Sequence, residues 1–198
     1  DETIALGGTI KKLSNNKIKV NVIIVGGHLP PLYNKKNYQI TKKESEKALK
    51  ILGVKKVNYL DIPALEFHKQ HYNTMNSKIN NLINNFNPTT VFIPFPDRHI
   101  DHRTVFDCAM VNTRPNKKNY PKFVLSYETL SETHWNAPYI EPNFNPDFFV
   151  NIYDTIKEKI KALNCYQSQI KNNQSRSIEA IQALAKFRGS QNGCNYAE

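Results

Sequence analysis

The segment 94-PFPDRHIDHRTVF-106 holds a dense group of side chains that can bind metal ions or transfer protons. His99 and His102 are three residues apart, which places them on one side of a turn or of a first helical turn. Asp97 and Asp101 lie beside them. A catalytic zinc ion takes three protein ligands from His, Asp or Glu and keeps a position open for water. The pattern favours metal chemistry, although such residues could instead cap the helix that follows.

Short apolar runs and helical segments alternate around this motif. Runs rich in β-branched or aromatic residues predict strands at 19–25, 56–62, 90–95 and 123–128. Helices are expected over 41–53, 73–86, 103–112, 152–170 and 176–187. The third of these strands ends just before the Asp97 to His102 motif. This alternation predicts one α/β domain over residues 1–198, with a Rossmann-like, three-layer fold and a mainly parallel sheet.

Two helix boundaries carry their own signals. Thr41 followed by Glu44 matches a capping box, so a helix is expected to begin there, and Gly53 stands where its end is expected. Residues 1–16 predict a loop entering a helix rather than a strand. The first strand of the α/β fold is therefore expected to lie outside this sequence, and both ends are expected to be trimmed.

Ligands of open α/β sheets bind beyond the carboxyl ends of the strands, which is where His99 and His102 stand. The start, 1-DETIALGGT-9, offers a second group. An acidic residue before a helix is by itself an ordinary N-cap. If the preceding strand lies centrally in the sheet, however, Asp1 would stand next to the His99 loop, and two loops would converge on one ion.

Composition narrows the classes of function. The formal charge is +10, but only five of the 27 basic residues are arginine, and the lysines are scattered among asparagines. This favours a solvated lysine-rich surface over a nucleic-acid partner. The three cysteines (Cys108, Cys165 and Cys194) form neither a disulfide framework nor a CxxC site, which favours a cytoplasmic protein, and Cys108 is expected in the core. No apolar run is long enough to span a membrane.

The paired motifs at Asp1 and at Asp97 resemble those of the PIG-L/LmbE-like family of zinc-dependent N-acetylglucosaminyl deacetylases. The first motif of that family reads AHPDDE before a helix with two glycines, and this chain begins at its second Asp. The phrases 44-ESEKALKILGV-54 and 184-LAKFRGSQNGCNYAE-198 are also similar to family text. The resemblance thus runs along nearly the whole chain.

The resemblance implies a role for each matching residue. Asp1 and His102 match zinc ligands, and the ion could alternatively be Fe²⁺. His99 matches the protonated histidine that stabilises the oxyanion or donates to the leaving amine, and Asp101 matches the acid that pairs with it. The third ligand and the general base of the family precede Asp1 and are not in this sequence.

The resemblance further implies an N-deacetylase that acts on an N-acetylated amino sugar or a sugar conjugate. The conjugate could be nucleotide-linked or a polysaccharide precursor. Many members carry an arginine at the position of Thr41, where Lys42 or Lys43 could substitute. The segment 127-YETLSETHW-135 is similar to a phrase in members that act on such precursors. It supplies the expected substrate-binding residues Tyr127, Glu128, His134 and Trp135.

Alternatives remain at this point. Trp135 could pack in the core instead of meeting a sugar ring, and His68 and His71 are expected on the surface. The domain could be a catalytically inactive sugar-binding protein of the same fold, or a metal-dependent hydrolase of another bond, such as a phosphoester. A homo-oligomer is also expected.

Overall fold

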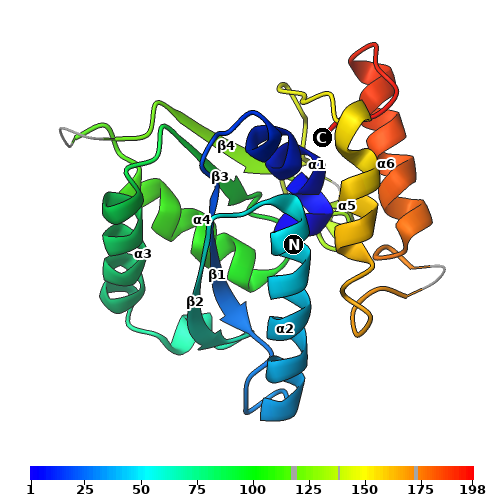
Figure 1. Ribbon diagram of the computed structural model, residues 1–198. Helices are drawn as coiled ribbons and strands as arrows, with labels where there is room; N and C mark the ends of the chain where they lie inside the picture. The colour runs from blue at the N-terminus through cyan, green and yellow to red at the C-terminus, as the bar shows by residue number, and fades with distance from the viewer. Residues whose placement is uncertain (117–119, 138, 172–173) are drawn as a thin grey trace. The chain divides into compact units, whose positions relative to one another are not determined.

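The computed structural model describes residues 1–116, 120–137, 139–171 and 174–198 (Figure 1). Helices and strands follow one another along the chain, and this confirms the predicted α/β class. In order, they are α1 (Glu2–Asn15), β1 (Asn21–Gly27), α2 (Lys35–Leu52), β2 (Lys56–Pro63), η1 (Phe67–Lys69), α3 (Tyr72–Phe86), β3 (Thr90–Pro94), α4 (Ile100–Asn112), β4 (Phe123–Tyr127), η2 (Thr133–Trp135), η3 (Tyr153–Thr155), α5 (Ile156–Leu163) and α6 (Ile178–Gln191).

The chain divides into two compact units. Unit 1 consists of residues 1–23, 33–58 and 145–198, and unit 2 consists of residues 24–32 and 59–144. Helices α1, α2, α5 and α6 belong to unit 1, whereas β3, β4, α3 and α4 belong to unit 2. The expectation of a single domain over residues 1–198 stays a prediction.

All four predicted strands form within two residues of their expected bounds. β3 and β4 pair in parallel, with Thr90 opposite Phe123 and Pro94 opposite Tyr127. β1 and β2 form a second two-stranded sheet. The parallel orientation predicted from the sequence is confirmed for β3 and β4, and it places the ends of these two strands at the same edge.

The core of unit 2 forms beneath the segment that carries the histidines. Met75, Ile79 and Ile83 recur every four residues along α3, so they form one buried stripe. They pack with Phe67 and with the fully buried Cys108 of α4, which confirms Cys108 as a core residue. Helix α4 also contacts β3 and α3, and these contacts fix the N-terminus of α4 beside the end of β3.

Unit 1 contains a buried ion pair between Glu198 and Lys159. Helix α1 contacts α2 and α5, and a Cβ at Gly8 would stand 2.7 Å from Ile152, so only glycine fits there. The Glu198 carboxylate accepts hydrogen bonds from the Gly8 and Thr9 amides (2.9 and 2.7 Å). It also pairs with Lys159, and both side chains are 3% exposed.

Helix α2 begins six residues earlier than the sequence predicts. Asn34 is its N-cap and accepts the Lys36 N–H at 2.9 Å. Thr41 lies inside the helix, where its hydroxyl donates to the Tyr38 carbonyl, so the predicted capping box is wrong. The predicted end is confirmed, because Gly53 adopts φ 82. The helix expected over 152–170 is shorter, and α5 ends at Leu163.

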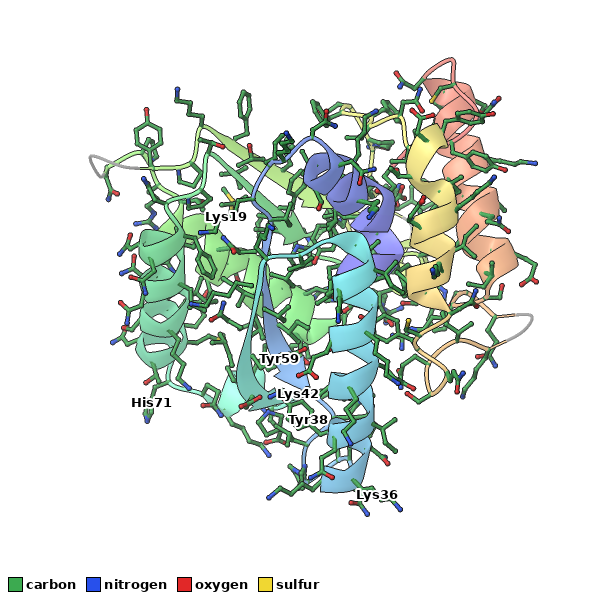
Figure 2. The ribbon with its side chains drawn as sticks, in the orientation of Figure 1. Lys19, Lys36, Tyr38, Lys42, Tyr59 and His71 are labelled. Atoms are coloured by element: carbon green, nitrogen blue, oxygen red, sulfur yellow. The ribbon has the colours of Figure 1, made fainter. Side chains whose placement is uncertain are left out.

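The formal charge is segregated between the units. Unit 1 contains 19 basic and nine acidic residues, while unit 2 contains eight of each, so the whole net charge of +10 belongs to unit 1. One exposed face of α2 carries Lys36, Ile40, Lys43, Lys47 and Lys50 at helical spacing. Figure 2 shows Lys36 and Lys42 on this helix. None of the helices in the described ranges is long and apolar enough to cross a membrane.

Candidate active site

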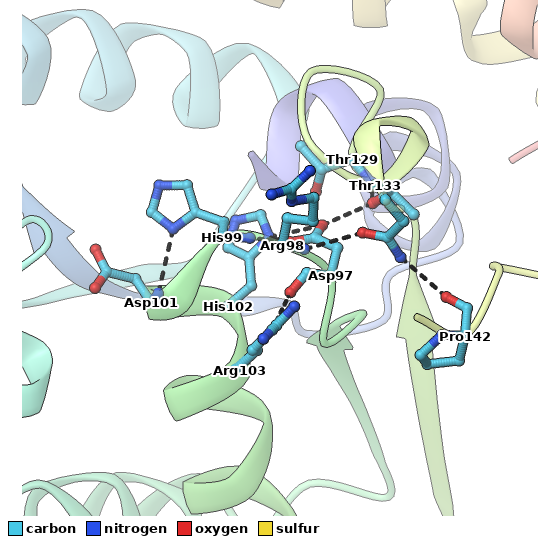
Figure 3. Close-up of polar contacts among 10 residues, drawn as sticks. Asp97, Arg98, His99, Asp101, His102, Arg103, Thr129, Thr133 and Pro142 are labelled. Carbon is cyan, nitrogen blue, oxygen red and sulfur yellow. Dashed lines mark hydrogen bonds and ion pairs between the residues drawn. The ribbon is translucent and has the colours of Figure 1, made fainter. Parts of the chain in front are cut away.

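The candidate site lies in unit 2, in the loop that joins β3 to α4. β3 ends at Pro94 and α4 begins at Ile100, so the five residues between them turn the chain at the carboxyl end of the strand. This is the edge at which parallel α/β sheets bind their ligands. Figure 3 shows the polar contacts of this loop.

Asp97 is the centre of these contacts and is fully buried. Its Oδ1 accepts the His99 N–H at 2.9 Å, and its Oδ2 accepts the Thr133 hydroxyl at 2.9 Å. Both oxygens lie 3.0 Å from His102 Nδ1. Burial alone would raise the pKa of Asp97, but the hydrogen bond and charge of His102, together with the other donors, outweigh burial and lower this pKa.

His102 is oriented by that carboxylate. The residue is 6% exposed, and its Nδ1 donates to Asp97, so Nε2 is the ring nitrogen that would bind a metal ion. Metal-binding histidines usually donate their other ring N–H to a carboxylate or a carbonyl. His102 therefore fits a zinc ligand. No group of three His, Cys, Asp or Glu side chains gathers around one point within the described residues.

His99 is the N-cap of α4. Its Nδ1 accepts the Asp101 N–H at 3.2 Å, as shown in Figure 3. The alternative that this motif caps the following helix is thus confirmed for His99. The cap bond explains why the His99 backbone is extended at the start of α4. An Nδ1 that accepts a hydrogen bond carries a lone pair, so the ring proton belongs on Nε2.

Asp101 contacts a different partner from the one expected. Its Oδ2 accepts the Leu65 N–H at 2.8 Å, and its Oδ1 is buried and has no hydrogen-bond partner. Burial raises the pKa of Asp101, against the opposing effects of the Leu65 amide and the nearby histidines. The contact between Asp101 and His99 runs through the Asp101 backbone rather than through its carboxylate. The His99 and His102 rings are stacked, with centroids 4.8 Å apart.

A second loop is tied to this one by several polar contacts. The Arg98 N–H donates to Asn136 Oδ1 at 3.0 Å, and Asn136 Nδ2 donates to the Pro142 carbonyl at 2.9 Å. Arg103, directly after His102, bonds both the Asp97 carbonyl and the Glu141 carboxylate. Together with the Thr133 hydroxyl, these contacts hold residues 133–136 and 141–142 against the loop of the histidines.

The predicted substrate-binding residues divide between the units. His134 Nε2 lies 2.9 Å from Glu128 Oε2, so these two side chains contact one another in unit 2. Trp135 is 65% exposed, and the alternative that it packs in the core is therefore wrong. Tyr127 ends β4. His68 and His71 are exposed, as predicted.

Two predicted residues belong to unit 1. Asp1 is exposed and stands at the N-cap position of α1, without a cap hydrogen bond from its side chain. Lys42 lies on α2, with Nζ 5.7 Å from the centroid of the Tyr38 ring. The roles of Asp1 as a metal ligand and of Lys42 as a substrate contact stay predictions.

Comparison with protein families matches residues 1–112 to PIG-L, described as GlcNAc-PI de-N-acetylase. The diacetylchitobiose deacetylase of Thermococcus kodakarensis is 26% identical over 219 residues, which cover 100% of this chain and 77% of that protein. The solved N,N′-diacetylchitobiose deacetylase of Pyrococcus horikoshii is 25% identical, with a TM-score of 0.79, and the match covers 100% of this chain and 78% of that one. This likeness confirms the Rossmann-like fold.

A third solved structure is a 4-carboxy-2-hydroxymuconate hydratase from Pseudomonas putida. It is 16% identical with a TM-score of 0.74, and the match covers 100% of this chain and 89% of that one. At this identity the likeness concerns the fold alone. One fold can carry different reactions, so the reaction has to be argued from the site.

Proposed function

This chain belongs to the PIG-L family, and from that membership together with the geometry of the β3–α4 loop we propose that it is a metal-dependent hydrolase. The reaction is removal of the acetyl group from an N-acetylated amino sugar or sugar conjugate. The observation that carries the proposal is the Asp97–His102 pair, which aims one imidazole nitrogen as a metal ligand beside the stacked ring of His99. Both named relatives above 20% identity are deacetylases of acetylated sugars by their descriptions.

His102 is the residue of unit 2 that we propose as a ligand of the metal ion, zinc or alternatively Fe²⁺, and Asp1 stays a ligand implied by the family resemblance. A bound zinc ion supplies hydroxide at neutral pH by lowering the pKa of its water from 15.7 to about 7. His102 would contribute the lone pair of its Nε2, because its Nδ1 hydrogen is donated to the Asp97 carboxylate. The loop therefore presents a ligand whose orientation is set before any ion arrives.

His99 is the donor that meets the substrate. Its Nδ1 is engaged by the Asp101 amide, so its proton is held on Nε2. A hydrogen bond from Nε2–H to the carbonyl oxygen of the amide stabilises the charge that develops there. The cap bond uses Nδ1 and the proposed contact with the substrate uses Nε2, so His99 can act as an oxyanion donor without losing its cap.

The sugar is proposed to contact the segment that follows β4. Exposed Trp135 offers an apolar ring face, and the His134–Glu128 pair beside it offers polar groups. Aromatic faces with polar neighbours suit pyranose rings. The substrate is proposed to be free, nucleotide-linked or part of a polysaccharide precursor. A cytoplasmic location and a homo-oligomer also stay proposals.

Acetate release tests the reaction. The protein, produced with the residues that the family resemblance expects ahead of Asp1, is incubated with added Zn²⁺ and with N,N′-diacetylchitobiose, N-acetylglucosamine or nucleotide-linked N-acetylglucosamine. We expect acetate from at least one of them, and a loss of roughly 100-fold or more in His102→Ala, because a missing ligand disables the metal site. His71→Ala, an exposed histidine of the same unit, is the matched control and should keep full activity.

The alternatives predict other results. Binding of these sugars without any acetate would instead support the catalytically inactive sugar-binding domain. Release of phosphate from a phosphoester panel, without acetate, would support a hydrolase of another bond.

A further inference from the structure

We propose that Asp97 is a positioning residue that fixes the tautomer of His102, and that Thr133 in turn fixes the Asp97 carboxylate. The proton of the His102 ring is held on Nδ1, so Nε2 keeps the lone pair that a metal ion needs. The inference rests on the proposed function in one respect, because it takes His102 as a metal ligand. It assigns roles to two residues outside the ligand set.

Among the described residues, every hydrogen-bond partner of the Asp97 carboxylate is a donor. Oδ1 accepts the His99 N–H, Oδ2 accepts the Thr133 hydroxyl, and His102 Nδ1 lies 3.0 Å from both oxygens. The side chain has no exposed surface. A buried carboxylate surrounded by donors remains an acceptor, so the nitrogen of His102 that faces it must carry a hydrogen.

Thr133 removes the remaining freedom of the carboxylate. Its Oγ1 accepts the Thr129 N–H at 2.8 Å, and this occupies a lone pair of the hydroxyl. The hydroxyl hydrogen therefore points to Asp97 Oδ2, at 2.9 Å between the oxygens. Thr133 is 3% exposed, so water does not compete for this contact. The order of donation runs from Thr129 through Thr133 to Asp97.

The consequence concerns both ring nitrogens of His102. A neutral imidazole carries one hydrogen, and a hydrogen on Nε2 would block metal binding there. Replacing Asp97 with Asn introduces an NH₂ group among donors, so the residue can no longer accept on every side. The tautomer of His102 with its hydrogen on Nδ1 is then no longer favoured. The same change to the wrong tautomer explains the large loss in the Asp→Asn variant of a serine protease triad.

Nitrogen NMR of metal-free, ¹⁵N-histidine-labelled full chain at pH 8 reads the tautomer directly. We expect His102 as the Nδ1–H form in the wild type and a shift toward the Nε2–H form in Asp97→Asn. An Nε2–H form in the wild type would overturn the proposal. Asp107→Asn on the same helix, where the side chain is exposed, is the matched control and should leave His102 unchanged.

Zinc affinity gives a second readout that does not depend on activity. In competition with a chromophoric chelator, Asp97→Asn should bind Zn²⁺ about 10- to 100-fold more weakly, as losses of such outer partners usually do. Should Asp97→Asn fail to fold, Thr133→Val decides: it should weaken binding, Thr133→Ser should restore it, and Thr104→Val on α4 should have no effect. Wild-type affinity in both Asp97→Asn and Thr133→Val, or no zinc binding by the wild type, contradicts the proposal.

Failure of the inference and failure of the proposed function look different. If the protein binds zinc through His102 but releases no acetate, the positioning role of Asp97 stands and the proposed deacetylase activity is wrong. If the protein releases acetate but Asp97→Asn has the wild-type tautomer and zinc affinity, the deacetylase activity stands and the positioning role of Asp97 is wrong.

Discussion

His99 combines a structural and a chemical task in one ring. Nδ1 caps α4 by accepting the Asp101 N–H, and Nε2 is the proposed donor to the substrate. The two tasks use different nitrogens, so they can be separated by substitution. The same cannot be said of Asp101, whose carboxylate holds the Leu65 amide and whose second oxygen is buried without a partner.

Asparagine at position 99 should keep the cap and lose the chemistry. His99→Asn retains an acceptor at a position where Asn is a preferred N-cap, so its stability should remain close to the wild type. His99→Ala removes the cap and should cost about 1 kcal/mol of unfolding free energy. Both should lose most deacetylase activity. Urea unfolding beside an acetate assay checks this, and an active His99→Asn would exclude the donor role.

At the scale of elements, the start of α2 depends on Asn34 and not on Thr41. Asn34→Ala should lower the unfolding free energy by about 1 kcal/mol, because the Lys36 N–H loses its acceptor. Thr41→Ala should change it little, since Thr41 lies inside the helix and bonds one carbonyl. Urea titrations of the two variants compare them directly. A larger loss in Thr41→Ala would restore the capping box as the helix start.

Glu141 links Ala137 to the loop that carries the histidines. This carboxylate accepts the Ala137 N–H and pairs with Arg103 and Arg98, and these partners lower its pKa. Glu141→Gln should weaken these contacts and raise KM by about two- to fivefold, with kcat nearly unchanged, because an exposed ion pair contributes no more than about 1 kcal/mol. Steady-state kinetics at two salt concentrations measures this. An unchanged KM would mean that the loop does not contact the substrate.

The elements were predictable from the sequence wherever burial follows a short period. The strands and α3 show this, since the spacing of Met75, Ile79 and Ile83 predicts one buried face of the helix. The start of α2 was missed because two capping signals compete there, and the choice between Asn34 and Thr41 depends on packing. The Asp97 network was missed for another reason. Its donors come from residues 99, 102 and 133, and Thr133 is 36 positions away in the sequence.

At the scale of the whole molecule, the net positive charge is concentrated in unit 1, and lysines on the exposed face of α2 repel one another. Lys43 and Lys47 are four residues apart on the exposed face, so they are like charges at neighbouring positions. Lys43→Gln with Lys47→Gln should raise the unfolding free energy by roughly 0.2–0.5 kcal/mol at low salt. Lys78→Gln with Lys122→Gln in neutral unit 2 is the matched control.

Salt identifies the cause of that gain. The Debye length falls from about 30 Å at 0.01 M salt to about 3 Å at 1 M, so screening should abolish the difference between variant and wild type. Thermal melts at both concentrations measure it. A gain that persists at about 1 M salt would point to helix propensity instead of repulsion.

The carboxylate of Glu198 gives the chain an order of assembly. It bonds the amides of Gly8 and Thr9, which lie 190 and 189 positions earlier, so unit 1 cannot close until residues 145–198 have been made. Every segment of unit 2 has left the ribosome well before that point. We therefore expect unit 2 to fold first during synthesis. Helices α1 and α2 can pack only later, because contacts between residues far apart in the sequence form slowly.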